Sequence, residues 1–111
     1  MSKITKKQIG VVGVDSGMIM VCDPCYIDSH WHHPTKQEGI DFDFEKKEYK
    51  GQFSYAGCAN ATIGNNGGEQ LNYPNGLEGA GVACTSGLGD GLYSVYAYYK
   101  EDRIIKVEIE F

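Results

Sequence analysis

The alternation of apolar and polar residues predicts a protein built from short strands. The clearest case is RIIKVEIEF (residues 103–111), where every second residue from 105 to 111 is apolar and the residues between them are charged. A period of two places successive side chains on opposite faces of a sheet. One face of this strand should therefore meet the core and the other water. Together with the run LYSVYAYY (92–99), it predicts a hairpin at the C-terminus.

The beginning of the chain predicts a second hairpin. Residues 1–7 are polar and are expected to be frayed. Two apolar runs follow, at 9–14 and 18–22, and an Asp-Ser-Gly turn (15–17) separates them. Asp and Ser bond to their own backbone in turns, and Gly tolerates a positive φ. The dipeptide Asp23-Pro24 should end the second run, because proline cannot donate to a strand ladder.

The middle of the chain is less regular. IDFDFE (40–45) alternates apolar and acidic residues, which predicts a half-exposed strand, and GQFSYAGC (51–58) is interpreted as another strand. Residues 59–80 carry two strong turn signals and are predicted to form one long loop. GVACTS (81–86) is predicted to be a short buried strand.

These elements predict one all-β domain over residues 1–111. Six or seven short, mainly antiparallel strands imply a small sandwich or a partly open barrel. Apolar residues make up 41% of the chain, with 15 glycines and 8 tyrosines, a composition that fits strands joined by tight turns. No apolar run is long enough to span a bilayer, and no signal-peptide segment follows the first lysines. We therefore expect a cytoplasmic protein with reduced thiols.

The net charge of −5 changes the expected partners. Nucleic-acid binding depends mainly on Lys and Arg neutralising phosphates. The only basic cluster, Lys3, Lys6 and Lys7, is interpreted as a solvated tail. An acidic chain fits protein partners better, including one that presents a cationic face, and we predict neither nucleic-acid nor membrane binding.

The stretch VCDPCYIDSHWHH (21–33) holds two of the four cysteines and all three histidines, so it raises the question of a zinc site. Structural zinc needs four Cys or His ligands, commonly as two close pairs. Cys22 and Cys25 form one such pair. The second pair would have to come from residues that the spacing does not bring together: Cys58, Cys84, His30, His32 and His33. We predict no metal and interpret most of the cysteines as small apolar core residues, while a zinc-stabilised interaction module stays open as an alternative.

Catalysis is the second alternative. Cys25 could act as a nucleophile with a nearby histidine as base, or the carboxylates Asp23 and Asp90 could act. Thioredoxin-like chemistry is disfavoured, because no helix follows Cys25 and Asp23 should raise a thiol pKa. The glycine-rich stretch GLGDG (87–91) could cradle an anion through its backbone N–H groups. It fits neither phosphate-binding fingerprint, and a tight turn is the preferred interpretation.

Three separated motifs resemble a family of small uncharacterised proteins from phages, prophages and bacteria. They are VDSGMIMVCDPCYI, GVACTSGLGDGLYSVYA and RIIKVEIEF. The matching positions are Asp15, Gly17, Asp23, Pro24, Cys25, Tyr26, Gly87, Gly89, Asp90, Gly91 and Tyr93. The sequence departs from the pattern at Cys22, where the family has glycine, and this departure weakens the zinc hypothesis. The resemblance implies a common fold and a common pocket, but no activity.

The sequence thus favours a small phage-type accessory protein that binds a host protein or a small ligand in the host cytoplasm. We expect neither catalysis nor a cofactor. The predicted binding residues are Asp15, Asp23, Cys25, Tyr26, Asp90 and Tyr93. Three further residues, Tyr96, Tyr98 and Ile104, are expected on the outer face of the final hairpin. Exposed aromatic residues on a sheet face often mark a contact with another chain, so we predict a homodimer or partner interface there.

Overall fold

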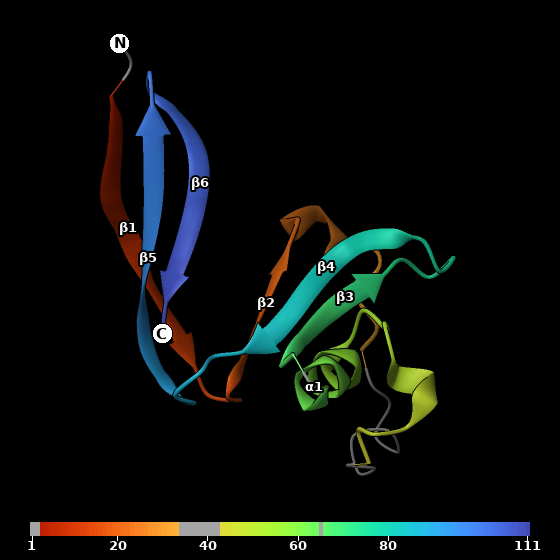
Figure 1. The fold of residues 1–111 in the computed structure, drawn as a ribbon. Helices are drawn as coiled ribbons and strands as arrows, with labels where there is room; N and C mark the ends of the chain where they lie inside the picture. Colours follow the sequence, from red (N-terminus) through yellow and green to blue (C-terminus); the bar gives the residue numbers. More distant parts are fainter. Residues whose placement is uncertain (1–2, 34–42, 65) are drawn as a thin grey trace. The chain divides into compact units, whose positions relative to one another are not determined.

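The chain forms two compact units, each with its own sheet. A computed structural model describes residues 3–33, 43–64 and 66–111. The terminal unit comprises Met1–Gly17 and Ser86–Phe111, and the central unit comprises Met18–Thr85. Each unit holds one three-stranded antiparallel sheet (Figure 1). The all-β prediction is confirmed, with six strands in the described part of the chain and no closed barrel. The single domain predicted for residues 1–111 stays a prediction.

The sheet of the terminal unit has the order β1-β5-β6. Its strands are β1 (Ile4–Val14), β5 (Gly91–Lys100) and β6 (Arg103–Glu110). Strands β5 and β6 form the predicted C-terminal hairpin, which is confirmed. Its two-residue turn, Glu101 and Asp102, has φ values of 54° and 63°. Two positive φ angles are typical of the type I′ turn, whose twist matches that of the flanking strands.

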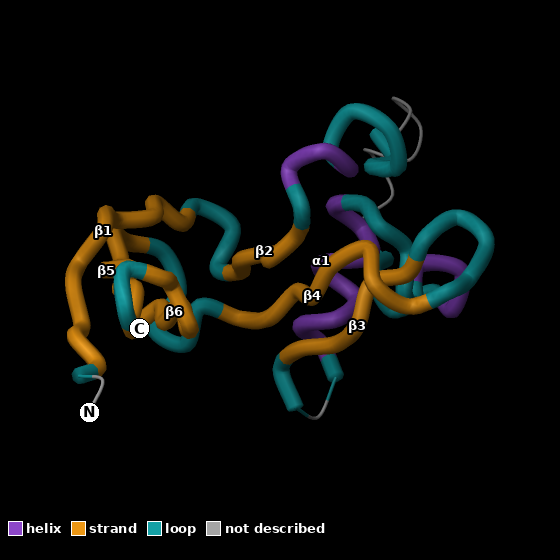
Figure 2. Tube along the Cα trace, turned by 90° about the horizontal axis from the view of Figure 1, so that it is seen from above, coloured by secondary structure: helices purple, strands orange, loops and turns teal. Residues whose placement is uncertain are grey.

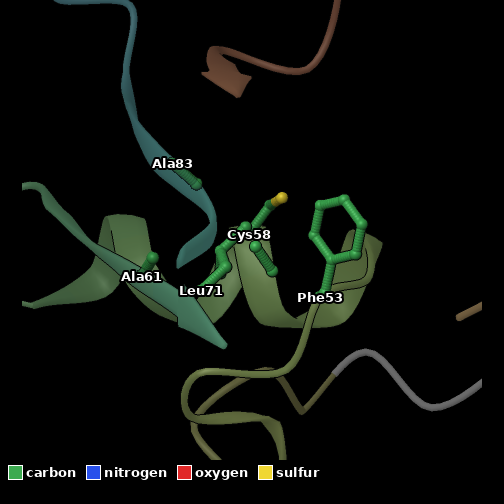
Figure 3. Packing of buried hydrophobic residues seen from close by; sticks show 6 residues of the cluster. Phe53, Cys58, Ala61, Leu71 and Ala83 are labelled. Atoms are coloured by element: carbon green, nitrogen blue, oxygen red, sulfur yellow. The ribbon is translucent and has the colours of Figure 1, made fainter. Parts of the chain in front are cut away.

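The sheet of the central unit has the order β2-β4-β3 and is packed against the α-helix of the described chain. Its strands are β2 (Met18–Cys22), β3 (Gly68–Asn72) and β4 (Glu78–Thr85), and the helix is α1 (Tyr55–Ile63). Figure 2 shows α1 beside β3 and β4, and it contacts all three strands. The core lies between helix and sheet, as Figure 3 shows. Its buried members are Phe53, Cys58, Ala61, Leu71, Ala80 and Ala83.

Helix α1 replaces the strand predicted over residues 51–58, and that prediction is wrong. Ser54 is the N-cap, and its hydroxyl accepts a hydrogen bond from the backbone N–H of Gly57 at 2.9 Å. The segment after it is rich in alanine, the strongest helix former. A side chain at Gly57 would collide with the carbonyl group of Gln52. Small residues therefore let the helix approach its neighbours closely. This close packing favours a helix over the strand that the apolar alternation at residues 53–55 suggests.

The hairpin predicted over residues 9–22 is also wrong. Strand β1 pairs with β5, and β2 pairs with β4, so the two runs belong to different sheets. The turn residue Gly17 has a φ of 71°, and its carbonyl accepts a hydrogen bond from the N–H of Ser86 at 3.0 Å. The turn therefore sends the chain from one unit to the other. Strand β1, with 11 residues, thereby gains a partner of 10 residues, whereas β2 has only five.

Three boundaries are corrected as well. Strand β1 begins at Ile4, so most of the predicted frayed segment 1–7 is paired, from Ile4 opposite Lys100 onward. The predicted loop 59–80 contains the end of α1, all of β3 and the first residues of β4. Of the strand predicted over 40–45, residues 40–42 lie outside the described residues, and Phe44 and Glu45 form a turn.

Candidate functional site

Strand β2 ends in a tight turn that uses Asp23 as a structural cap. The 3₁₀ helix η1 (Pro24–Tyr26) follows, with proline at its first turn, where no N–H is needed. The Asp23 carboxylate accepts a hydrogen bond from the backbone N–H of Cys25 at 3.0 Å. Hydrogen bonds from the backbone and side chain of Cys25 lower the pKa of Asp23. A carboxylate occupied in this way fixes the turn.

The thiol of Cys25 is exposed but not activated. The pKa of Cys25 is raised, first because its thiol is hydrogen-bonded to the Asp23 carboxylate, which favours the protonated form. The pKa of Cys22 is also raised, by burial and then by the charge of Asp23. Burial in the core raises the pKa of Cys58 to about 11. Since the thiolate is the nucleophile, these environments disfavour covalent chemistry.

Metal ligands do not converge in the part of the chain that the structure describes. No three side chains of His, Cys, Asp or Glu come together there in an arrangement that could hold a metal ion. Cys58 lies in the hydrophobic core with its sulfur 3.7 Å from the sulfur of Met20. Cys84 lies on β4, where it pairs with Ile19.

The residues after η1 build a cluster of three rings. Tyr26 packs edge-on against His30 and against Tyr73, with centroid distances of 5.0 and 5.3 Å. The hydroxyl of Tyr73 donates to that of Tyr26 at 3.3 Å, and this contact raises the pKa of Tyr26 to about 12. The Nδ1 atom of His30 lies 2.7 Å from the hydroxyl of Ser29. The histidine is therefore oriented within an aromatic cluster.

Two further rings, from distant parts of the sequence, lie in contact. Trp31 and Phe53 meet edge-on at 5.0 Å, and both belong to or pack against the core. The backbone N–H of His32 donates to the carbonyl of Phe53 at 2.9 Å. Isolated bridges join His32 to Ser54 and Gln52 to Asn72, both in parallel orientation. These backbone contacts hold segments that are far apart in sequence beside each other.

The rings of these clusters other than Tyr26 line an open groove of about 440 Å³ within the central unit, which we call the aromatic groove. Its ring-bearing and apolar wall consists of His30, Trp31, His32, Phe53, Tyr73 and Pro74. Two exposed residues of opposite charge, Glu48 and Lys50, also line it. Ligand pockets characteristically combine apolar and aromatic walls with a few placed polar groups. The groove has this composition.

Amide groups complete the lining of the aromatic groove. The backbone N–H of Asn72 donates to the carbonyl of Gly51 at 2.7 Å, which joins β3 to the segment before α1. The side-chain oxygen of Asn72 is buried and has no hydrogen-bond partner among the described residues. A buried acceptor without a partner costs about 1–3 kcal/mol. Turning this amide toward a donor in the groove would recover part of that cost.

The remaining predicted site residues belong to the terminal unit. Val14 pairs with Gly91, so Asp15 and Asp90 flank this pair at one end of the sheet. The hydroxyl of Tyr93 donates to the carbonyl of Gly89 at 2.6 Å. The glycine-rich stretch is therefore a turn held by the hydroxyl of Tyr93. This agrees with the tight turn that the sequence predicts.

The six predicted binding residues thus form two sets. Asp23, Cys25 and Tyr26 lie together in the central unit, and Tyr26 contacts the groove residues His30 and Tyr73. Asp15, Asp90 and Tyr93 lie in the terminal unit. Their role in binding stays a prediction.

Most residues of the groove were not predicted from the sequence. The signal available for it was Asn72-Tyr73, an amide and an aromatic residue directly before a Pro-Asn-Gly turn. Nothing in the sequence indicated that this turn would lie beside the segment Lys50–Phe53, because backbone contacts between distant segments make that arrangement.

The outer face predicted for the final hairpin needs one correction. A register shift between Tyr98 and Tyr99 places Ile104 opposite Tyr99. Residues directly opposite one another share a face. Ile104 therefore lies on the face opposite to that of Tyr96 and Tyr98. The physical reason is a β-bulge, which adds one residue to β6 and reverses the alternation that the sequence pattern assumes.

The fold and the groove define a small strand-rich protein with one α-helix in its described part and an open aromatic groove. Residues 1–109 match the family described as "Protein of unknown function (DUF4241)", and the chain belongs to this family. The prediction of an uncharacterised family is confirmed in that form. No curated protein and no solved structure matches the chain. Among the described residues, no helix is long and apolar enough to cross a membrane.

Proposed function

We propose that this protein acts by binding a partner rather than by catalysis, and that the aromatic groove receives the partner. The observation that carries the proposal is the groove itself. It joins ring walls, two exposed charges and amide groups in a single open space of about 440 Å³. Such a space suits an extended protein segment or a small ligand with an apolar part and hydrogen-bonding groups.

The groups considered for catalysis support the same proposal. The Cys25 thiol has a raised pKa, and the Asp23 carboxylate is occupied as a cap. A nucleophile needs a base within hydrogen-bond reach, oriented by a third group. The ring of His30 packs against Tyr26 and Tyr73, and its Nδ1 atom is engaged with Ser29. Enzymatic use of Cys25 would require these contacts to rearrange.

The polar groups of the groove indicate the kind of partner. Glu48 and Lys50 are both exposed and offer one negative and one positive contact. Neither sign of charge dominates the groove, so a partner segment with mixed polarity fits better than a polyanion. The resemblance of three motifs to phage and prophage proteins supports a host protein as this partner, met in the host cytoplasm.

The test is capture from a bacterial lysate with three versions of the full chain. The double variant Glu48→Lys with Lys50→Glu exchanges the two groove charges and leaves the net charge unchanged. The control is Lys47→Glu, an exposed residue outside the groove lining. Wild type and control should retain the same partner, and the double variant should lose it. Equal capture by the double variant would contradict the proposal.

A further inference from the structure

Strand β6 is a long open edge of the terminal unit. In the sheet order β1-β5-β6 it pairs, among the described residues, with β5 alone, over Arg103–Glu110. An edge strand presents unpaired N–H and C=O groups that can template pairing with another chain. The edge also carries exposed apolar side chains, with Val107 57% and Ile105 41% exposed. Exposed apolar residues on an unpaired edge are a feature of strands that pair with another chain.

The charges of β6 are ordered in sign along one face. Lys106 pairs with Tyr98 and Glu108 pairs with Tyr96, so all four side chains share a face. Lys106 and Glu108 are two positions apart and flank Val107, which lies on the other face. An antiparallel copy of this strand presents the same two charges in reverse order. The strand is thereby complementary to itself.

We propose that β6 pairs in antiparallel fashion with β6 of a second copy, with Val107 opposite Val107 of that copy at the two-fold axis. Each Lys106 then lies opposite the Glu108 of the other chain, twice by symmetry. Ile105 lies opposite Ile109 on the apolar face. The two three-stranded sheets become one six-stranded sheet. An interface of this kind is isologous, the commonest form of homodimer.

The charge pattern selects this register over its neighbours. A slip that centres the pair on residue 108 opposes two glutamates, and one that centres it on residue 106 opposes two lysines. Like charges directly opposite each other in a sheet are destabilising. A slip of one residue would bring apolar side chains of one copy onto the charged face of the other. In the Val107-centred register Lys106 meets Glu108 at both contacts and no like charges lie opposite each other.

The other sheet edges of the described chain are less suited to pairing. Strand β1 has a register shift between Gln8 and Gly10, and it carries Lys6 and Lys7 side by side. Bulges and edge lysines are devices that prevent pairing. Strands β2 and β3 are only five residues long. Strand β6 also has a bulge, at Ile105, but its residues 106–110 pair with β5 in unbroken register and its lysine is matched by a glutamate.

The interface is independent of the aromatic groove, which belongs to the central unit. Charge exchange tests it directly. In Lys106→Glu the pairing opposes glutamates at both contacts, and in Glu108→Lys it opposes lysines. An equal mixture of the two variants restores opposite charges at both contacts. Dimerisation should therefore be lost in each variant alone and recovered in the mixture as a heterodimer.

The measurement is sedimentation velocity at micromolar concentrations, with circular dichroism to verify that each variant keeps its strands. Each single variant should weaken dimerisation by at least ~10-fold, and the mixture should return to within a few-fold of wild type. Lys47→Glu, with the same charge change elsewhere, should dimerise like wild type. A monomeric wild type, variants that dimerise normally, or a mixture that stays monomeric would each overturn the proposal.

Cross-linking tests the two-fold position without altering charge. Directly opposed residues in a sheet have Cβ atoms about 4.5–5.5 Å apart, close enough for a disulfide. A Val107→Cys variant should therefore form a covalent dimer on mild oxidation, faster than wild type with its native cysteines. Glu110→Cys should show no such gain, because in this register residue 110 of one copy does not lie opposite residue 110 of the other. Equal cross-linking at both positions would overturn the register.

Discussion

The hydroxyl groups of Ser86 and Tyr93 donate to the same acceptor, the carbonyl oxygen of Gly89, at 2.5 and 2.6 Å. Gly89 has a φ of 97°, a conformation that L side chains rarely adopt. Ser86 is fully buried, and Tyr93 packs edge-on against Phe111 at 5.2 Å. The most distinctive motif of the sequence thus fixes the turn into β5 and attaches the end of the chain to it.

Replacing Tyr93 by phenylalanine should destabilise the terminal unit. The ring stays in place, but the bond to Gly89 is lost, which costs about 0.5–1.5 kcal/mol. The change can be measured as a lower midpoint of urea unfolding followed by near-ultraviolet circular dichroism. Tyr96→Phe is the control, because the Tyr96 ring is half-buried and its described contact is with the Lys6 ammonium above the ring. Equal effects in the two variants would show that the hydroxyl of Tyr93 has no special role.

The core of the central unit depends on Leu71. This side chain is fully buried between α1 and the sheet. Leu71→Ala should lower the free energy of unfolding by about 2–5 kcal/mol, through lost burial and the cavity that remains. Leu77→Ala removes the same atoms from a residue that is 65% exposed and should change stability by less than about 0.5 kcal/mol. Comparable losses in the two variants would contradict the core as described.

The thiol of Cys25 should react slowly near neutral pH, although it is exposed. Asp23→Asn keeps an oxygen that can cap the turn but removes the charge and the hydrogen bond that raise the pKa of Cys25. The pKa of Cys25 should fall toward its ordinary value, and alkylation by iodoacetamide at fixed pH should become faster. Mass spectrometry resolves this rate from that of buried Cys58. A wild-type Cys25 that reacts faster than a free thiol, and more slowly in the variant, would indicate an activated nucleophile instead.

The carboxylate of Glu108 should titrate below its ordinary pKa of 4.5 because Lys6 is hydrogen-bonded to it, with nitrogen and oxygen 3.0 Å apart. A lowered folded-state pKa means that the contribution to stability is present above 4.5 and is lost as pH falls through the folded value. The pKa of Lys6 is raised, so its contribution is present below 10.5 and is lost as pH rises through that raised value.

Carbon-detected NMR titration of Glu108 tests this pair. In Lys6→Met the pKa of Glu108 should move upward toward 4.5, whereas Lys7→Met, one position along on the opposite face, should leave it in place. A Glu108 that titrates normally in the wild type would show that the pair does not persist in solution.

The strand-rich fold could be predicted where apolar and polar residues alternate along a strand and a tight turn joins that strand to its pairing partner. This condition holds for β5 and β6, joined by two residues with positive φ. It fails for β1 and β2, because β1 pairs with residues 91–100 and β2 with residues 81–85, both distant in sequence, and the Asp-Ser-Gly sequence only indicates a turn. It fails again at residues 51–58, where the Ser54 cap and close packing at Gly57 favour a helix over alternation.

The candidate site was predictable only in part. Asp23, Cys25 and Tyr26 form a local motif that the turn places together, but none of them lines the aromatic groove. The aromatic groove also needs Phe53 and Tyr73, which reach it through bridges between distant segments. Periodicity carries no information about such contacts, and the bulge in β6 shows that one extra residue is enough to reverse a predicted face.

Hydrogen exchange of the captured complex tests binding in the aromatic groove most directly. The amides of free and bound protein are compared by mass spectrometry. The account predicts new protection at residues 30–33, 48–53 and 72–76, which line the groove or adjoin its lining, and little change in the turn at 86–91. Protection confined to the terminal unit, or absent from the groove segments, would contradict it.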